Sequence, residues 1–317
     1  MPTSNIQASF EIPGTLSFQR HGALEKAVIT TDSCVGEVFL QGAHITHWQP
    51  HGEEPVLFLS ENSAFLPGKA IRGGIPIIFP WFGARTPNKH SSRTDGPAHG
   101  FARTQTWQVT GATASGENLV LAFQLLPNDE SAALGFENFS LNYEVSMGKT
   151  LELKLTCTNT GQTSQHIDRE AGPILFEEAL HTYFAASDID NVSVSGLANT
   201  EYLDKTDDMK RKRQEEKLLK LSGETDRPYL NTSATVTLLD QGFQRRIKIE
   251  KEQSLTTVVW NPGETLAGKM ADMQANGFRR FICVESANAM ENAVVLQAGE
   301  SHCLSVKISV ERFQQKD

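Results

Sequence analysis

The sequence predicts an all-β protein built as an antiparallel β-sandwich, and three observations carry that prediction. Apolar and polar residues alternate over many short segments, turn residues separate these segments, and long helical patterns are scarce. Strands at short spacing with hairpin-like gaps are typical of antiparallel sandwiches.

The clearest alternation lies in Leu151–Thr158, where every second residue from Leu151 to Cys157 is apolar. Such a period of two places the apolar side chains on one face of a strand. Similar patterns occupy Asn118–Leu126, Phe139–Met147, Phe243–Lys251, Ser254–Trp260 and His302–Val310. Gly, Pro and Asn residues between them indicate tight turns. The best helix candidate is Gly263–Gly277, with Gly277 as its stop.

The chain has 317 residues, no internal repeat and no linker-like boundary, so we expect a single domain over residues 1–317. Its N-terminus has neither a basic region nor an apolar core typical of a signal peptide. No apolar run reaches the roughly 20 residues that span a bilayer. We therefore expect a cytoplasmic protein without a membrane partner.

Cysteine usage agrees with that compartment. None of the four cysteines has CxxC spacing, and their neighbours alternate between apolar and polar types. They are Cys34, Cys157, Cys283 and Cys303. This pattern predicts reduced thiols in the core.

The net charge of −9 excludes a protein held to nucleic acid mainly by phosphate attraction. One charge-dense run, Lys205–Lys220, mixes acidic with basic residues. We interpret it as a solvated loop or short helix rather than a basic patch or nuclear signal.

Three histidines, His44, His47 and His51, have a spacing that invites a metal-site hypothesis. The segment instead has the pattern of a strand followed by a proline turn, which puts His44 and His47 on opposite faces. No carboxylate supports them, so no metal site is predicted.

An arginine and two glycines interrupt the apolar segment Lys69–Gly83, which reads KAIRGGIPIIFPWFG. The glycines suggest that another backbone or a ligand approaches closely, and a loop whose backbone N–H groups face a ligand fits them. A structural bridge between Arg72 and a carboxylate is an equal alternative. Pro97–Arg103 adds His99 and Arg103, and the two segments together favour a small anionic or polyhydroxylated ligand.

Two further segments hold candidate proton-transfer groups. His181 lies among apolar and aromatic residues in Glu177–Asp188, and Glu285 follows the apolar run Phe281–Val284. We expect Glu285 at the inner end of a strand or at its mouth. Taken singly, such residues are more commonly a core histidine and a solvated glutamate.

Four segments in order, IRGGIPIIFPWFG, HGFAR, ALHTYF and ICVES, resemble the hexose-6-phosphate mutarotases, also called glucose-6-phosphate 1-epimerases, of the aldose 1-epimerase superfamily. The resemblance extends from about Ala27 to Val310. It implies a galactose-mutarotase-like antiparallel β-supersandwich with a few short helices and a concave sugar site. It implies no metal and no cofactor.

The resemblance also implies roles for six residues. His181 matches the catalytic histidine and Glu285 the catalytic carboxylate. The positions that match substrate-binding residues are Arg72, His99, Arg103 and Asp226. Ala98 departs from the pattern, because some members carry a ligand-contacting glutamine there.

The implied reaction is interconversion of the α and β anomers of an aldohexose 6-phosphate by acid–base ring opening. Glu285 would take the proton of the C1 hydroxyl while His181 protonates the ring oxygen, which calls for a charged carboxylate and a protonated imidazole. Arg72 and Arg103 would bind the phosphate, and Asp226 a hydroxyl. Aromatic residues would give the sugar apolar faces or pack in the core, namely Trp81, Phe82, Phe101 and Tyr183.

The resemblance thus implies a monomeric glucose-6-phosphate 1-epimerase whose partner is a hexose 6-phosphate, with no nucleic acid. Two alternatives stay open: a non-catalytic β-sandwich module that binds sugar phosphate, and a free-sugar aldose 1-epimerase. A glycoside hydrolase is disfavoured, because one matched carboxylate is present where such enzymes usually need two.

Overall fold

A computed structural model describes residues 7–88, 91–161 and 172–313. Residues 1–6, part of the segment considered for a targeting signal, lie outside the described residues. All pairings between the named strands are antiparallel. Within the described part of the chain, no helix is long and apolar enough to cross a membrane.

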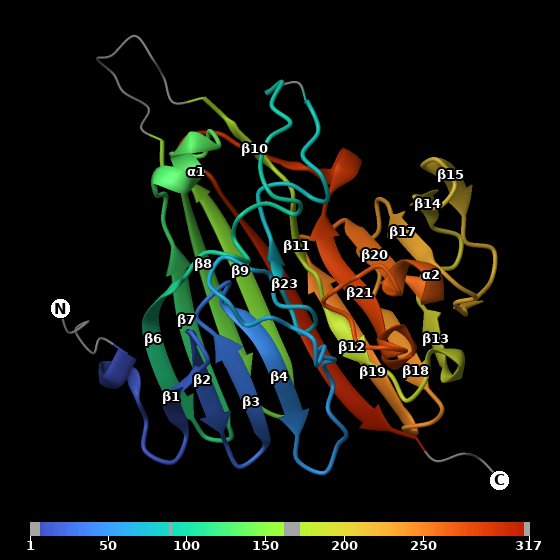
Figure 1. The fold of residues 1–317 in the computed structure, drawn as a ribbon, viewed down its shortest axis with the longest axis horizontal. Coiled ribbons are helices and arrows are strands. Elements are labelled where there is room, and N and C mark those ends of the chain that lie inside the picture. Colours follow the sequence, from blue (N-terminus) through green and yellow to red (C-terminus); the bar gives the residue numbers. More distant parts are fainter. Residues whose placement is uncertain (1–6, 89–90, 162–171, 314–317) are drawn as a thin grey trace.

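The largest sheet has nine strands and forms one wall of the molecule (Figure 1). In spatial order they are β16 (Leu218–Leu219), β13 (Val192–Ser195), β18 (Val236–Asp240), β19 (Arg245–Glu252), β23 (Ser301–Arg312), β9 (Leu151–Asn159), β8 (Phe139–Met147), β7 (Asn118–Leu125) and β6 (Gln108–Ser115).

A second sheet, of eight strands, carries the residues that matter most below. Its order is β15 (Lys210–Arg213), β14 (Glu201–Asp204), β17 (Thr225–Tyr229), β20 (Thr256–Asn261), β21 (Phe281–Asn288), β11 (Glu178–Leu180) and β5 (Ile77–Ile78), with β12 (Tyr183–Ala185) also paired to β21.

The remaining elements are smaller. A four-stranded sheet has the order β1 (Leu16–His21), β2 (Leu24–Thr30), β3 (Cys34–Phe39) and β4 (His44–Pro50), and β10 (Ile174–Phe176) pairs with β22 (Val294–Leu296). The helices among the described residues are α1 (Asp129–Ala133), α2 (Gly263–Ala267) and the 3₁₀ turns Gln7–Phe10, Ile189–Asn191, Gly277–Arg280 and Met290–Asn292.

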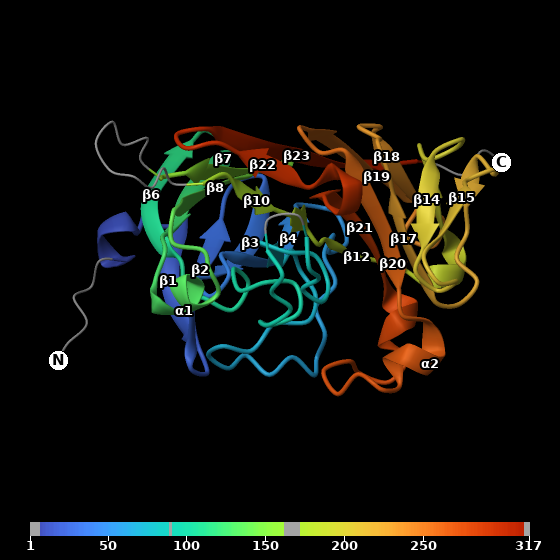
Figure 2. The ribbon, with the colours of Figure 1, turned by 90° about the horizontal axis from the view of Figure 1, so that it is seen from above.

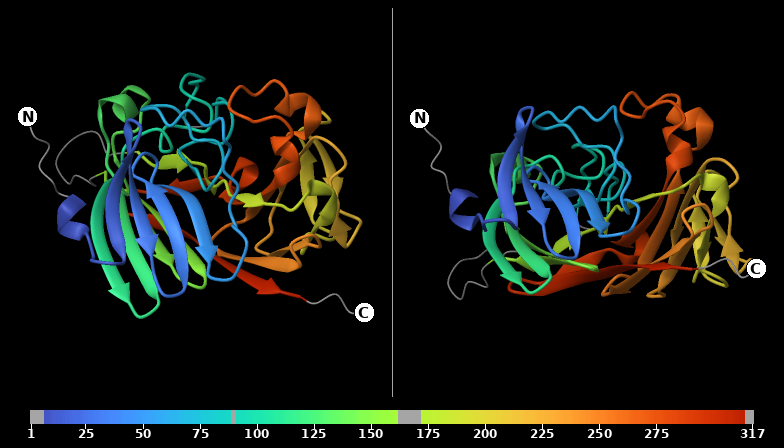
Figure 3. Two further views of the ribbon diagram at one scale, coloured as in Figure 1. Left: turned by 60° about the horizontal axis from the view of Figure 1, so that its bottom comes forward. Right: turned by 90° about the horizontal axis from the view of Figure 1, so that it is seen from below.

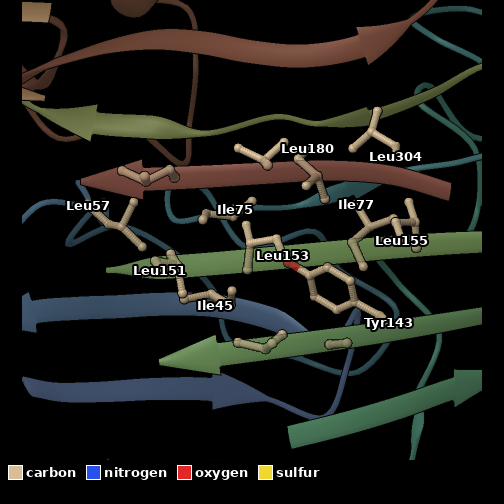
Figure 4. Close-up of a cluster of buried hydrophobic side chains, with 14 of the residues drawn as sticks. Ile45, Leu57, Ile75, Ile77, Tyr143, Leu151, Leu153, Leu155, Leu180 and Leu304 are labelled. Carbon is tan, nitrogen blue, oxygen red and sulfur yellow. The ribbon is translucent and has the colours of Figure 1, made fainter. Parts of the chain in front are cut away.

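The sheets form layers around one continuous apolar core. The four-stranded sheet and the β17–β20–β21 region both lie on the same side of the nine-stranded sheet (Figures 2 and 3). Between them, leucines of β9 meet Ile45, Ile75 and Leu180 (Figure 4). This arrangement confirms the prediction of an all-β antiparallel sandwich.

The period-two segments become strands with the predicted faces. In β9 every second residue, beginning with Leu151, is buried, and the residues between them are more exposed. Phe139–Met147 is a strand over its whole length as β8. The other predicted segments match β7, β19, β20 and β23 with shifted ends.

The long helix predicted over Gly263–Gly277 is wrong. Helix α2 ends at Ala267 because Gly268 forms its C-cap, and Asn276 adopts a left-handed backbone with φ of 58°. Met273 packs against Tyr183 and Phe281 rather than along one helical stripe. The segment is therefore mainly a loop folded over the β21 region.

The charge-dense run also differs from the expected loop or short helix. Part of it forms β15, which pairs with β14 in a hairpin, and Arg211 and Arg213 both bond to Glu201 across the pair. The prediction for the cysteines holds for three of them, which are buried, whereas Cys303 is half-buried. All four are free thiols.

A buried ion pair links the two large sheets. His302 Nε2 of β23 lies 3.0 Å from Glu178 Oε1 of β11, and Asn288 of β21 donates to the same carboxylate oxygen at 2.9 Å. Burial opposes the charge on His302, but the hydrogen bond and the charge of Glu178 raise the pKa of His302 above its ordinary value. The charged imidazole therefore stabilises the contact between the sheets.

This pair predicts a pH-dependent contribution to stability. A raised folded-state pKa contributes fully below the unfolded value of about 6.5 and is lost as pH rises through the folded value. His302→Gln should cost about 1–3 kcal/mol at pH 5.5, and the difference should shrink by pH 8.5. Denaturant unfolding measures it, with exposed His51→Gln as the control. A gap that widens with pH would contradict the assignment.

Candidate active site

Glu285 owes its position to the alternation of β21. Ile282 and Val284 point into the main core, so Cys283 and Glu285 point to the opposite face of the sheet. The strand continues through Asn288, and all of its residues are buried. The expectation that Glu285 ends the strand is therefore wrong, because it stands in the middle of β21 and is only 1% exposed.

His181 lies in the two-residue gap between β11 and β12, which both pair with β21. Leu180 is opposite Ser286 and Tyr183 is opposite Cys283, so continuing this register places His181 opposite Glu285. His181 Nε2 lies 3.3 Å from Glu285 Oε1. The two groups thus converge, at direct contact rather than at the span of a pyranose ring.

Neighbouring rings fix the His181 imidazole. It stacks on Tyr183 at 4.9 Å between centroids, and Trp260 meets it edge-on at 5.9 Å. The His99 ring lies 5.6 Å away. His181 is 6% exposed, and its Nδ1 has no hydrogen-bond partner among the described residues. The ring is therefore held in one orientation with a polar atom left for a ligand or a proton.

Arg72 forms an ion pair with a carboxylate, as one of the two interpretations of the sequence predicted. Its Nε donates to Asp272 Oδ2 at 3.1 Å, Nη2 lies 3.0 Å from the same oxygen, and Nη1 donates to the Tyr183 hydroxyl at 2.9 Å. These contacts use three of its five N–H groups. Since the side chain is 24% exposed, the two others stay available to an anion.

The two glycines after Arg72 make room for neighbouring backbone and not for a ligand. The interpretation of this loop as one whose N–H groups face a ligand is therefore wrong. Gly73 and Gly74 have φ of 116° and 62°, and Gly74 donates its N–H to the Phe58 carbonyl at 2.7 Å. A Cβ on Gly74 would lie 2.2 Å from the Ile45 carbonyl oxygen. Only glycine fits such a position without strain.

The loop that carries His99 and Arg103 is anchored in the same way. A Cβ on Gly100 would collide with the Phe79 carbonyl. Arg103 Nη2 donates to the Ala98 carbonyl at 2.8 Å, while its buried Nε has no partner among the described residues. His99 Nδ1 accepts from the Gly83 N–H at 3.2 Å, so a neutral ring carries its proton on Nε2.

Asp226 approaches from β17, where it lies opposite Trp260 of β20. Its Oδ2 is 2.7 Å from Lys205 Nζ. The sequence reasoning missed Lys205 as a site residue because it opens a solvated charge run. It also missed Asp272, which falls inside the segment taken as a helix.

The aromatic residues divide between site and core. Tyr183 contacts His181, and the Phe82 ring meets His99 edge-on at 5.1 Å. Trp81 and Phe101 belong to the main core.

Burial and the surrounding charges set unusual protonation states. Burial, His99, Arg103 and Arg72 together hold the pKa of His181 well below its usual range. Burial and the charge of Asp226 hold the pKa of Glu285 well above its usual range, while Lys205 acts against that shift. Both shifts favour the neutral forms, an uncharged imidazole beside a protonated carboxyl group, which is the opposite of the expected charged carboxylate and protonated imidazole.

His181 and Glu285 have one titratable proton to share, whichever of the two groups carries it. A neutral imidazole with a carboxylic acid and an imidazolium with a carboxylate have the same net charge, and the proton need only cross the 3.3 Å contact. Strongly interacting groups titrate as a unit. A ligand that changes the charges around one partner therefore decides which group holds the proton.

One group of possible metal ligands is present among the described residues. Atoms of His181, Cys283 and Glu285 lie within 4.8 Å of one another. Burial and the charge of Glu285 raise the pKa of the Cys283 thiol well above its usual range, so it stays protonated. A protonated thiol is a poor metal ligand, and this trio better suits proton transfer. His44, from the histidine-rich segment, bonds instead to the Gly73 carbonyl at 2.7 Å.

Comparison with known proteins is consistent with this geometry. A family model described as aldose 1-epimerase matches residues 26–309. The chain belongs to the aldose 1-epimerase family. An Escherichia coli (strain K12) protein named "Putative glucose-6-phosphate 1-epimerase" is 34% identical over 92% of each chain. A similarly named protein from Cenchrus ciliaris is 31% identical, covering 87% of this chain and 82% of its own.

Solved structures of similar proteins share the fold. The crystal structure of a "putative mutarotase" from Salmonella typhimurium has a TM-score of 0.85 at 31% identity, covering 96% of each chain. A galactose mutarotase-like protein from Clostridium acetobutylicum has a TM-score of 0.70 at 12% identity, covering 94% of this chain and 99% of its own, a likeness of fold alone. The resemblance stated from the four motifs is confirmed.

Because the pKa of His181 is low, we predict that its imidazole does not titrate near neutral pH. In the ligand-free protein its imidazole should stay neutral from pH 8 down to about pH 5.5, because burial and the nearby cations disfavour its charged form. Nitrogen-15 NMR of labelled histidine measures this, with His181→Gln assigning the signal. His51, exposed on the surface, is the internal control. A His181 midpoint near 6.5 would contradict the electrostatic assignment.

Proposed function

We propose that this aldose 1-epimerase family member is a glucose-6-phosphate 1-epimerase that interconverts the α and β anomers of aldohexose 6-phosphates. The observation that carries the proposal is the buried contact between His181 and Glu285 at 3.3 Å. Each group also has a buried polar atom without a partner among the described residues, His181 Nδ1 and Glu285 Oε2. Buried polar atoms without partners are rare in folded proteins, and at this site they suit a substrate.

The chemistry needs one acid and one base at the same carbon. The C1 hydroxyl oxygen and the ring oxygen are both bonded to C1 and so lie close together. Two side chains in direct contact can therefore reach both oxygens once they move slightly apart. Glu285 takes the hydroxyl proton as His181 protonates the ring oxygen, and the ring opens. Rotation about C1–C2 and the reverse transfers close the other anomer. Each positioned proton transfer contributes typically about 10²–10⁴-fold.

The phosphate ester prepares the pair for this reaction. Arg72 and Arg103 are two of the charges that lower the pKa of His181, and a phosphate dianion between them would offset both. The pKa of His181 would then rise, and the proton would move from Glu285 to His181. Substrate binding thus creates the carboxylate base and the imidazolium acid.

The remaining contacts fit a polyhydroxylated ring. We propose that His99 Nε2 and Asp226 Oδ1 bind sugar hydroxyls, since Asp226 Oδ2 is already held by Lys205. Tyr183 and Phe82 offer apolar surface. Ala98 supplies no side-chain contact, and its carbonyl instead orients Arg103.

We also propose that residues 1–317 form a single domain that acts as a monomer in the cytoplasm. One apolar core that includes residues of all the large sheets supports the single domain. Free cysteines suit a reducing compartment.

The catalytic pair predicts large losses on single substitution. Glu285→Gln and His181→Ala should each lower catalysed anomer exchange of glucose 6-phosphate by about 10²–10⁴-fold, because each removes one proton-transfer group. Saturation-transfer NMR measures the exchange. Glu291→Gln and His51→Ala, both outside the site, should exchange at the wild-type rate. Two active-site variants with wild-type rates would refute the proposal, and binding without exchange in the wild type would favour the non-catalytic module.

The arginines predict selectivity for the phosphate ester. Arg103→Gln should lower kcat/KM for glucose 6-phosphate by roughly 10–100-fold, the value of a charged hydrogen bond, with a much smaller effect on free glucose. Exchange measured side by side on both sugars checks this, with Arg93→Gln as an exposed control. Equal losses on both sugars would favour the free-sugar aldose 1-epimerase.

A further inference from the structure

Lys205 is tied to Asp226 through both backbone and side chain. It follows β14 directly, and its N–H donates to the Asp226 carbonyl at 3.0 Å. Its Nζ lies 2.7 Å from Asp226 Oδ2. The two side chains are 30% and 19% exposed, so water screens this ion pair less than it screens a surface pair.

The same lysine also reaches the aromatic wall of the site. Its Nζ lies 5.6 Å from the centre of the Phe82 ring, whose edge meets His99. The Phe82 backbone is held by Glu177, which accepts its N–H at 2.8 Å. The ammonium is therefore confined between a carboxylate and a fixed ring.

Asp226 and Glu285 share one face of the sheet. Asp226 lies opposite Trp260, and Trp260 lies opposite Cys283, which points the same way as Glu285. The buried carboxylate of Glu285 and the half-buried one of Asp226 on this face disfavour each other's charge. Consistent with this, Asp226 raises the pKa of Glu285 and Lys205 lowers it.

The charged and titratable groups around this pair divide into two sets. Arg72, Arg103 and His99 act on His181. Asp226 and Lys205 act on Glu285. Tyr183 and Cys283 complete the neighbourhood. The cation that acts on the carboxylate therefore differs from the cations that a phosphate would neutralise.

We propose that Lys205 is a positioning residue that pins the Asp226 carboxylate and keeps a positive charge beside Glu285, so that Glu285 can ionise and act as the base. The inference rests on the proposed function of the site and extends it. The proposed function assigns the phosphate to Arg72 and Arg103, so the charge of Lys205, already paired with Asp226, would persist in the substrate complex. Substrate binding thus favours the protonated form of His181, and Lys205 favours the ionised form of Glu285.

The first test is the pH dependence of anomer exchange. In Lys205→Met, Asp226 loses its counter-charge and Glu285 ionises less readily, so the acidic limb of kcat for glucose 6-phosphate should move to higher pH. Exchange at pH 6 should fall at least about tenfold and approach the wild-type rate near pH 9. Lys205→Arg keeps the charge and should keep the wild-type profile.

A matched lysine controls for the loss of a surface charge. Lys210 lies in the same hairpin and pairs with Asp207 at 2.7 Å. Lys210→Met should leave the pH profile unchanged. An equal loss at every pH in Lys205→Met would show a merely structural lysine and overturn the proposal.

A second readout does not depend on activity. Carbon-13 NMR of glutamate labelled at the carboxyl carbon follows the titration of Glu285, which Glu285→Gln identifies. The midpoint should be higher in Lys205→Met than in the wild type, and adding Asp226→Asn should bring it back down. An unchanged midpoint in both variants would refute the role of Lys205. A shifted midpoint in a protein that accelerates no exchange would refute the proposed function alone.

Discussion

The contact between His181 and Glu285 is the interaction on which the rest of the site depends. It is set by strand register, since both neighbours of the His181 gap pair with β21. The imidazole and the carboxyl group are both buried and lie 3.3 Å apart, within reach of direct proton transfer. Tyr183 and Trp260 hold the imidazole in place, and the charged residues nearby shift the pKa of one group or the other. A shift of β21 by one residue would turn Glu285 into the core and abolish the site.

Different charged residues act on His181 and on Glu285, which the sequence analysis had treated together as one acid–base pair. The arginines and His99 lower the pKa of His181, while Asp226 and Lys205 act in opposite directions on the pKa of Glu285. Without ligand, burial and the surrounding charges favour a neutral imidazole and a protonated carboxyl group. Under the proposed function, a phosphate bound by the arginines would reverse that preference. Binding energy from the phosphate, which takes no part in the bonds that change at C1, would thereby be used at the reacting centre.

Much of this was predictable from the sequence, and the failures have physical reasons. Alternation predicted the strands because a buried face leaves a period of two, as in β9. The ordered motifs singled out His181, Glu285 and Arg72, and the fold brings the first two into contact and Arg72 onto Tyr183 beside them. Gly73 and Gly74 were misread because sequence does not tell which backbone approaches a glycine. Lys205 was missed because it opens a charge-dense run that was interpreted as solvated, and Asp272 because it falls inside the segment predicted as a helix, which ends at Ala267.

The central claim is that His181 and Glu285 act as one proton-transfer unit. A double-mutant comparison of catalysed glucose 6-phosphate exchange tests it most directly. If the pair works as a unit, His181→Ala combined with Glu285→Gln should lose no more rate than the more damaging single substitution. Losses that multiply, so that the double variant is slower by the product of the two single factors, would show that the residues act independently and would contradict the account.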